Sequence, residues 1–180
     1  MKFFTPELLA KLQDRSGKAS FLAAHDEWER AIADYKKQLR KIHDKLPVDL
    51  QHLIDAVPLH DAQVLDMWWG GRSQFTITLH AQSAASRLVV LTYSLVEKPG
   101  VAKDILPAAV RSDPTGWLYD ELDLGGAKKR GTVTFVHNIL LSDGREIRLH
   151  FRSVTVKRPL PLVPVSLPAL VKLDGARHSA

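Results

Sequence analysis

Large side chains recur at alternating spacings of four and three residues in the first third of the chain. The series consists of Phe21, His25, Trp28, Ile32, Tyr35, Leu39, Ile42 and Leu46. A period of 3.5 residues held over more than three heptads predicts one long amphipathic helix. Ser20 is expected as its N-cap, and Pro47 ends it from outside. Such a helix must lie along a sheet or pair with another helix.

Two shorter helices flank this long one. Thr5 and Pro6 predict the start of a helix over residues 6–14, because threonine accepts a bond from a free helical amide and proline suits the first helical position. Asp49 is expected to cap a further helix that ends near Ala56.

Beyond the helices the hydrophobic period changes to two, which is typical of strands with one buried face. Residues 62–69 and 74–81 predict a hairpin around Gly70-Gly71, a dipeptide suited to positive-φ turn positions. Residues 87–96 predict a third strand that is apolar on both faces and therefore central.

A second hairpin is predicted between residues 132–141 and 145–156. A three-residue loop with Gly144 in the left-handed position keeps apolar side chains on one face, whereas a two-residue loop mixes the faces. The predicted cross-strand pairs are Ile139 with Ile147, His137 with Leu149, and Phe135 with Phe151. From residue 153 the apolar phase slips, which indicates a bulge.

These patterns predict an α+β fold with helices first and an antiparallel β-meander of about five strands after them. We expect a single domain over residues 1–157, helical over about 1–57 and sheet over about 58–157. Residues 158–180 contain several prolines and are expected to form an extended tail.

Composition narrows the class of protein. The chain has 180 residues, 45% of them hydrophobic, and no cysteine, which excludes disulfide frameworks and thiolate chemistry. No apolar run approaches the roughly 20 residues of a membrane span. The N-terminus carries proline and acid where a signal peptide needs an apolar stretch. We therefore expect a cytoplasmic protein that does not span a membrane.

Common catalytic motifs are missing from the sequence, and the histidine spacing matches no familiar ligand set, so we expect no metal or cofactor. The weak catalytic candidates are His60 and Asp61 at a strand start, together with the carboxylates of residues 113–123. These carboxylates are Asp113, Asp120, Glu121 and Asp123. An acid–base or metal-dependent hydrolase using them is one alternative.

Candidate interaction residues lie on the predicted strands. Trp68 and Trp69 place two large aromatic rings at a hairpin tip, where one can pack inward and the other can anchor a partner. Arg148, His150 and Arg152 share the outer face of the last strand. With a net charge of +5, this basic stripe permits nucleic-acid binding as a further alternative. We disfavour it because no nucleic-acid motif accompanies the charge.

Several short segments resemble a family of short bacterial proteins of unknown function. They are Met1-Lys2-Phe3-Phe4-Thr5, Leu59-His60-Asp61-Ala62, Trp117-x-Tyr119-Asp120-Glu121 and the closing strand after an Asp-Gly turn. The combination of front helices, a sheet behind them and a Leu-His-Asp strand start is also similar to immunity proteins of bacterial toxin systems. The resemblance covers about residues 1–157 and supplies no catalytic residues.

The sequence thus favours a bacterial, non-enzymatic protein-binding module, which the resemblance extends to an immunity-type inhibitor. We expect a protein partner, and the heptad series of the long helix also allows a homodimer. Hydrolase activity and nucleic-acid binding stay open as alternatives.

Overall fold

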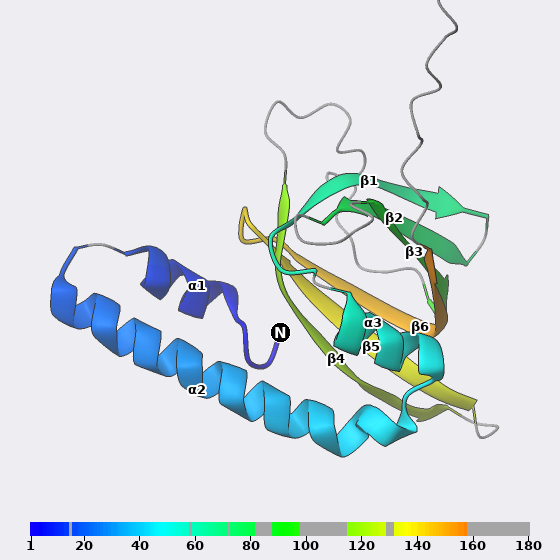
Figure 1. Ribbon diagram of the computed structural model, residues 1–180, viewed down its shortest axis with the longest axis horizontal. Coiled ribbons are helices and arrows are strands. Elements are labelled where there is room, and N and C mark those ends of the chain that lie inside the picture. Colours follow the sequence, from blue (N-terminus) through cyan, green and yellow to red (C-terminus); the bar gives the residue numbers. More distant parts are fainter. Residues whose placement is uncertain are drawn as a thin grey trace, which may run out of the picture.

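Three α-helices precede six strands in the part of the chain that the structure describes (Figure 1). This computed structural model describes residues 1–14, 16–57, 59–71, 73–81, 88–97, 115–128 and 132–157. The helices are α1 (Pro6–Gln13), α2 (Lys18–Ile42) and α3 (Val48–Ala56), with a 3-10 turn, His43–Lys45, between the last two. The strands are β1 (Ala62–Gly70), β2 (Gln74–His80), β3 (Leu88–Leu95), β4 (Gly116–Lys128), β5 (Thr132–Leu141) and β6 (Glu146–Lys157). The predicted α+β class, with helices before an antiparallel sheet, is confirmed.

Within these residues the six strands form a closed barrel in the order β1-β2-β3-β6-β5-β4. The prediction of about five strands in one meander is wrong. Two three-stranded meanders, β1–β3 and β4–β6, are joined where β3 pairs with β6 and β1 pairs with β4. The strand missed from the sequence is β4. Its register shifts after Trp117 and again after Leu124, so its apolar side chains do not keep a period of two.

Alternate side chains of the strands fill the barrel and form the main core. The fully buried ones include Phe75, Ile77, Leu79, Val89, Leu91, Tyr93, Trp117, Ile139, Ile147, Leu149 and Phe151. Strand β3 lies between β2 and β6, but every strand of a closed barrel has two neighbours and only alternate side chains of β3 are buried, so the predicted central strand is not distinguished. Gly71 in the β1–β2 turn has the expected positive φ, 72°, whereas Gly70 is the last residue of β1 and pairs with Gln74.

The β5–β6 hairpin has the predicted register. Phe135 lies opposite Phe151, and both His137–Leu149 and Ile139–Ile147 pair as expected. Gly144 adopts a φ of 80° in the turn, and its amide donates to the carbonyl of Leu141 at 2.9 Å. The predicted phase slip is also present, because the pairing of β6 with β3 skips Arg152.

The helix caps differ in part from the predictions. Thr5 caps α1 as expected, since its side chain accepts from the Leu8 amide at 3.2 Å. Ser20 is not the N-cap of α2. The N-cap is Gly17, and the helix begins at Lys18. The Ser20 hydroxyl instead donates to the Gly17 carbonyl at 2.8 Å. Asp49 is not the cap of α3 either, because that helix begins directly after Pro47.

The heptad series of α2 packs against its own chain over only part of its length. Trp28, Ile42 and Leu46 are buried, whereas Phe21 at the start of the helix is 42% exposed. The first turns of α2 extend past the barrel beside α1, and the rest of the helix runs along β4 (Figure 1). Whether the exposed start also contacts a second copy stays a prediction.

The helices attach to the barrel through two apolar clusters. Leu50 and Leu53 of α3, with Val57 after it, join the main core. A smaller cluster lies between α1, α2 and the outside of the barrel; it consists of Phe4, Leu8, Leu9, Trp28 and Leu140. Among the helices of the described ranges, none is long and apolar enough to cross a bilayer.

Candidate functional site

Strands β1 and β4 close the barrel over only a short stretch. Two residue pairs join them, Ala62 with Trp117 and Gln63 with Gly116. Because β4 continues to Lys128, most of its edge on this side has no strand partner among the described residues. Side chains of α2 and α3 lie across from this open edge.

Two side chains form hydrogen bonds with backbone groups of β4 that have no strand partner. The Leu122 amide donates to the Tyr35 hydroxyl of α2 at 2.9 Å. The Leu118 carbonyl accepts from Nδ1 of His60 at 2.5 Å. A carbonyl oxygen only accepts, so Nδ1 of His60 carries a proton. The Tyr35 bond thus joins α2 to the β4 edge through a side chain, and the His60 bond joins the start of β1 to it.

A cavity of about 410 Å³ lies in the gap between α2, α3 and β4. Its lining is mainly apolar and consists of Phe4, Ile32, Tyr35, Lys36, Leu39, Leu53, Ile54, Val57, Leu59, His60, Leu118, Tyr119, Asp120, Leu122 and His137. Lys36 and His60 are exposed, so they mark the side on which the cavity meets solvent.

A chain of hydrogen bonds runs from the barrel core to the cavity wall. The Tyr93 hydroxyl lies 2.9 Å from Nδ1 of His137, and Nε2 of His137 lies 2.9 Å from Oδ2 of Asp120. The other carboxylate oxygen of Asp120 accepts from the Trp117 indole at 3.0 Å. Tyr93, His137 and Trp117 are buried, whereas the Asp120 side chain is 30% exposed. Asp120 is therefore the member of this hydrogen-bond series that lies at the cavity surface.

The protons of this chain follow from what each group can donate. An ionised Asp120 accepts from Nε2–H of His137, which leaves Nδ1 of a neutral ring to accept from the Tyr93 hydroxyl. Every polar atom of the chain then has a partner, as a buried network requires.

The electrostatics agree with an ionised carboxylate. Burial raises the pKa of Asp120, but the hydrogen bonds from His137 and Trp117 outweigh it, so the pKa lies below its usual value. Burial and the charge of Asp120 raise the pKa of both Tyr35 and Tyr93, so both hydroxyls stay protonated. Apart from the exposed Lys36 and His60 at the mouth, the cavity lining thus presents one carboxylate among uncharged groups.

His60 and Asp61, predicted as an acid–base pair, lie side by side at the start of β1. Nε2 of His60 is 3.4 Å from Oδ2 of Asp61. Only His60 lines the cavity, with its ring 4.6 Å from that of Tyr119. Asp61 points to solvent and has a φ of 60°, which Asp tolerates better than most residues. The structure therefore brings His60, but not Asp61, to the same cavity as Asp120.

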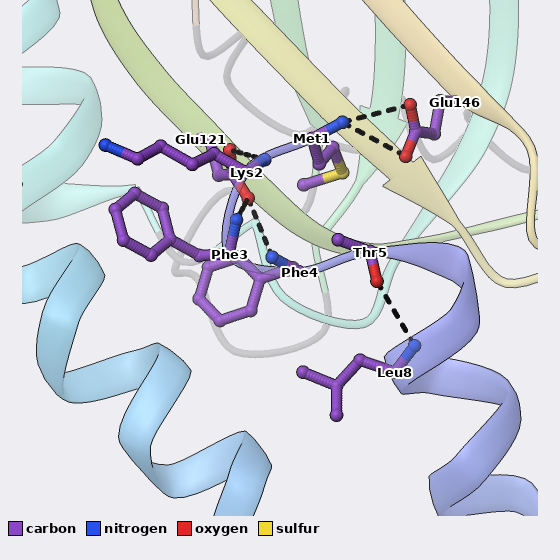
Figure 2. Close-up of polar contacts among 8 residues, drawn as sticks. All are labelled: Met1, Lys2, Phe3, Phe4, Thr5, Leu8, Glu121 and Glu146. Carbon is purple, nitrogen blue, oxygen red and sulfur yellow. Dashed lines mark hydrogen bonds and ion pairs between the residues drawn. The ribbon is translucent and has the colours of Figure 1, made fainter.

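Glu121 holds the N-terminal segment (Figure 2). Its carboxylate accepts three backbone amides, from Lys2 at 2.8 Å, Phe3 at 2.6 Å and Phe4 at 2.7 Å. Glu121 is only 4% exposed and is not among the residues that line the cavity. A second bond to this segment joins the Met1 amino group to the Glu146 carboxylate at 3.1 Å (Figure 2).

Asp123, another of the predicted carboxylates, does not line the cavity with Asp120. Asp123 accepts from the amide of the next residue, Leu124, at 2.8 Å. Asp113 lies outside the described residues. Over the ranges that the structure describes, no group of three or more His, Asp or Glu side chains is placed to hold a metal ion.

The two tryptophans of the first hairpin are separated as the sequence suggested. Trp68 is 47% exposed on the outer face of β1. Trp69 is half-buried and packs against Phe75 with ring centroids 5.0 Å apart. Leu65 of the same strand is 39% exposed, so β1 presents two apolar side chains to solvent.

The predicted basic stripe lies on β6. Arg148 and Arg152 are exposed, whereas His150 is largely enclosed by its neighbours. Nε2 of His150 lies 2.9 Å from the Thr134 hydroxyl, and Nδ1 lies 3.0 Å from the Glu97 carboxylate. The His150 ring is thus held in place within the barrel wall, and only the two arginines are free to meet a partner from solvent.

Sequence reasoning missed most of the residues whose hydrogen bonds run from the barrel core to the cavity. Tyr93 gave no signal beyond a position in an apolar strand, Trp117 lay in the strand that was missed, and His137 was interpreted as a core histidine. The usable signal was the pairing of His137 with Leu149, because it places an imidazole on an otherwise apolar inner face. Such a ring needs a partner, and the adjacent strand supplies Asp120.

Comparison with known proteins adds no family to this description. No protein-family model matches the chain, and no curated protein is similar to it. The class defined by the fold and the site is therefore structural: an α+β protein whose six-stranded barrel carries a helix-covered cavity at its incompletely paired edge.

Proposed function

We propose that the protein is a non-enzymatic binding protein and that the cavity between α2, α3 and β4 takes a small, mainly apolar organic molecule. The observation that carries this proposal is the cavity itself, with its apolar lining and few polar groups. Binding pockets for small molecules have about 300–1,000 Å³, mostly apolar walls and a small number of polar groups that orient the ligand. A volume of about 410 Å³ lies within that range.

The arrangement of the polar groups supports binding more than catalysis. Both nitrogens of His137 are engaged, and the ring lies behind Asp120 with 1% of its side chain exposed. A general base needs a free nitrogen within reach of its substrate. Asp120 accepts two hydrogen bonds that hold its carboxylate in one position, which suits recognition of a ligand group. The hydrolase alternative stays a prediction without a second observation in its favour.

A variant that fills the cavity tests the proposal. Ile54 of α3 lines the cavity and is half-buried, so Ile54→Trp places a larger ring into it without overpacking the barrel core. Val48 of the same helix is 78% exposed and does not line the cavity, so Val48→Trp is the matched control.

Ligand-observed NMR with a library of aromatic amines, alcohols and acids provides the measurement. We expect fragments that bind the unaltered protein and the Val48→Trp variant, and that lose at least about tenfold in affinity on Ile54→Trp. Binding that is unchanged by Ile54→Trp, or a library without a single binder, would contradict the proposal.

A second candidate function is binding of a protein partner through the outer face of β1, as expected from the sequence. The exposure of Trp68 and Leu65 on one strand favours it, because interfaces often centre on an aromatic anchor. An immunity-type inhibitor would be one form of such a partner-binding protein. Affinity capture from the host should retain one protein on the unaltered chain and lose it on Trp68→Ala. Val133→Ala, which changes another exposed apolar residue, is the control, and equal capture by all three proteins would refute this function.

A further inference from the structure

We infer that the cavity selects organic cations: molecules with an apolar body and a protonated amine that pairs with Asp120. This inference rests on the proposed function, since it names the class of ligand for the same cavity. It follows from three features of the lining, which are the carboxylate, the aromatic rings near it and the position of the positively charged side chains.

The first feature is a carboxylate whose partners in the described part of the chain are a tryptophan and a histidine. Asp120 accepts from the Trp117 indole and from His137, both of which can donate as neutral groups. Among the described residues no lysine or arginine nitrogen lies within 4.0 Å of it. These two hydrogen bonds already favour the ionised form of Asp120, but as neutral donors they bring no positive charge to it. An ammonium group in the cavity would supply both that charge and a charge-assisted hydrogen bond.

The second feature is the set of aromatic rings that line the same cavity. Phe4, Tyr35 and Tyr119 contribute rings from the N-terminal segment, α2 and β4. Phe4 packs against both tyrosines, with centroid distances of 5.4 Å to Tyr35 and 5.0 Å to Tyr119. Aromatic faces attract ammonium groups and repel carboxylates. The rings and Asp120 therefore favour the same sign of charge.

The third feature is the location of the positive side chains. Lys36 lines the cavity but is exposed, and the His60 side chain is 53% exposed. Solvent and salt screen such charges at the mouth far more than they screen a charge inside. The apolar lining residues Ile32, Leu39 and Ile54 lie between helices and strand, where they can cover the body of a ligand whose amine reaches Asp120.

Three probes with one apolar body and different head groups test this inference: 4-phenylbutylamine, 4-phenylbutanol and 4-phenylbutyrate. Isothermal titration should show that the amine binds at least about tenfold more tightly than the alcohol, and that the butyrate binds most weakly. This comparison needs no variant, so it does not depend on the folding of an altered chain.

Asp120→Asn then assigns the selectivity to one residue. The asparagine carbonyl can still accept a hydrogen bond from Trp117 or His137, and circular dichroism will show whether the fold is kept. We expect this variant to bind the amine only as well as the alcohol. Asp123→Asn removes the same charge from the same strand outside the cavity and should keep the preference for the amine.

The outcomes separate the two proposals. If the alcohol binds as well as the amine, or the butyrate binds most tightly, the cavity is a ligand site but the inference of cation selectivity is overturned. If Asp120→Asn folds and keeps the preference for the amine, the assignment to Asp120 is overturned. If none of the three probes binds while other fragments depend on Ile54, only the cation inference fails. If no fragment binds at all, the proposed function fails with it.

Discussion

Replacement of Glu121 by glutamine tests how the N-terminal segment is attached. In the structure one carboxylate oxygen accepts from the amides of Phe3 and Phe4, and the other accepts from the amide of Lys2. Glutamine keeps one oxygen for the first two amides but turns its NH₂ group toward the third. One hydrogen bond is lost, the remaining two lose their charge assistance, and two donors face each other.

The expected loss follows from these contacts. Hydrogen bonds to a charged group contribute about 1.5–3 kcal/mol each, so Glu121→Gln should lower the free energy of unfolding by about 2–3 kcal/mol. Glu146→Gln is the control, because its carboxylate also binds this segment but is 35% exposed. An exposed ion pair contributes about 0–1 kcal/mol, so the control should change stability little.

Urea unfolding followed by tryptophan fluorescence measures both free energies. Hydrogen exchange should also show faster exchange of the Phe3 and Phe4 amides in Glu121→Gln. A loss below about 0.5 kcal/mol, together with unchanged exchange at these amides, would refute the idea that Glu121 holds the segment. Because Phe4 lines the cavity, the same variant is expected to weaken the binding of probes there.

Three further predictions concern the barrel. Tyr93→Phe removes the hydroxyl that donates a hydrogen bond to Nδ1 of His137, and it should lower the free energy of unfolding in urea by about 1–2 kcal/mol. An unchanged free energy of unfolding would contradict this hydrogen bond. Because the folded-state pKa of Asp120 is lowered, its contribution is present above the ordinary Asp pKa of about 3.9 and is lost as the pH falls below it. The stability difference between the unaltered protein and Asp120→Asn should therefore shrink between pH 6 and pH 3, and a constant difference would be inconsistent with this assignment. Gly125→Ala places a Cβ 2.6 Å from the Thr134 hydroxyl and 2.8 Å from Nε2 of His150, so it should cost about 1–3 kcal/mol, and thermal unfolding at the unaltered midpoint would disprove the close approach.

Much of the fold could be predicted where local signals agree with the tertiary structure. The β5–β6 register followed from one glycine in a left-handed turn and from side chains that alternate toward one core. Strand β4 could not be predicted in this way, because bulges interrupt its alternation and Asp120 occupies an inward position. The prediction of Ser20 as the N-cap of α2 was wrong because glycine also suits this position, and the local sequence did not distinguish Gly17 from Ser20.

The cavity could be predicted only in fragments. His60 and Asp120 were among the candidate residues, but Tyr35, Tyr93 and His137 reach the same region from α2, β3 and β5. Their proximity depends on barrel closure and on the short β1–β4 pairing, neither of which has a local sequence signal. Glu121 was grouped with Asp120 by adjacency, although neighbouring strand residues point to opposite sides.

The central claim is that the gap beside β4 is a ligand site. The most direct measurement is a methyl NMR titration of the protein with 4-phenylbutylamine. Saturable shifts should be confined to lining residues such as Ile32, Leu39 and Ile54, with intermolecular contacts between the ligand and these methyl groups. Shifts that occur instead at exposed positions such as Leu65 and Val133, or a spectrum that does not change, would contradict it.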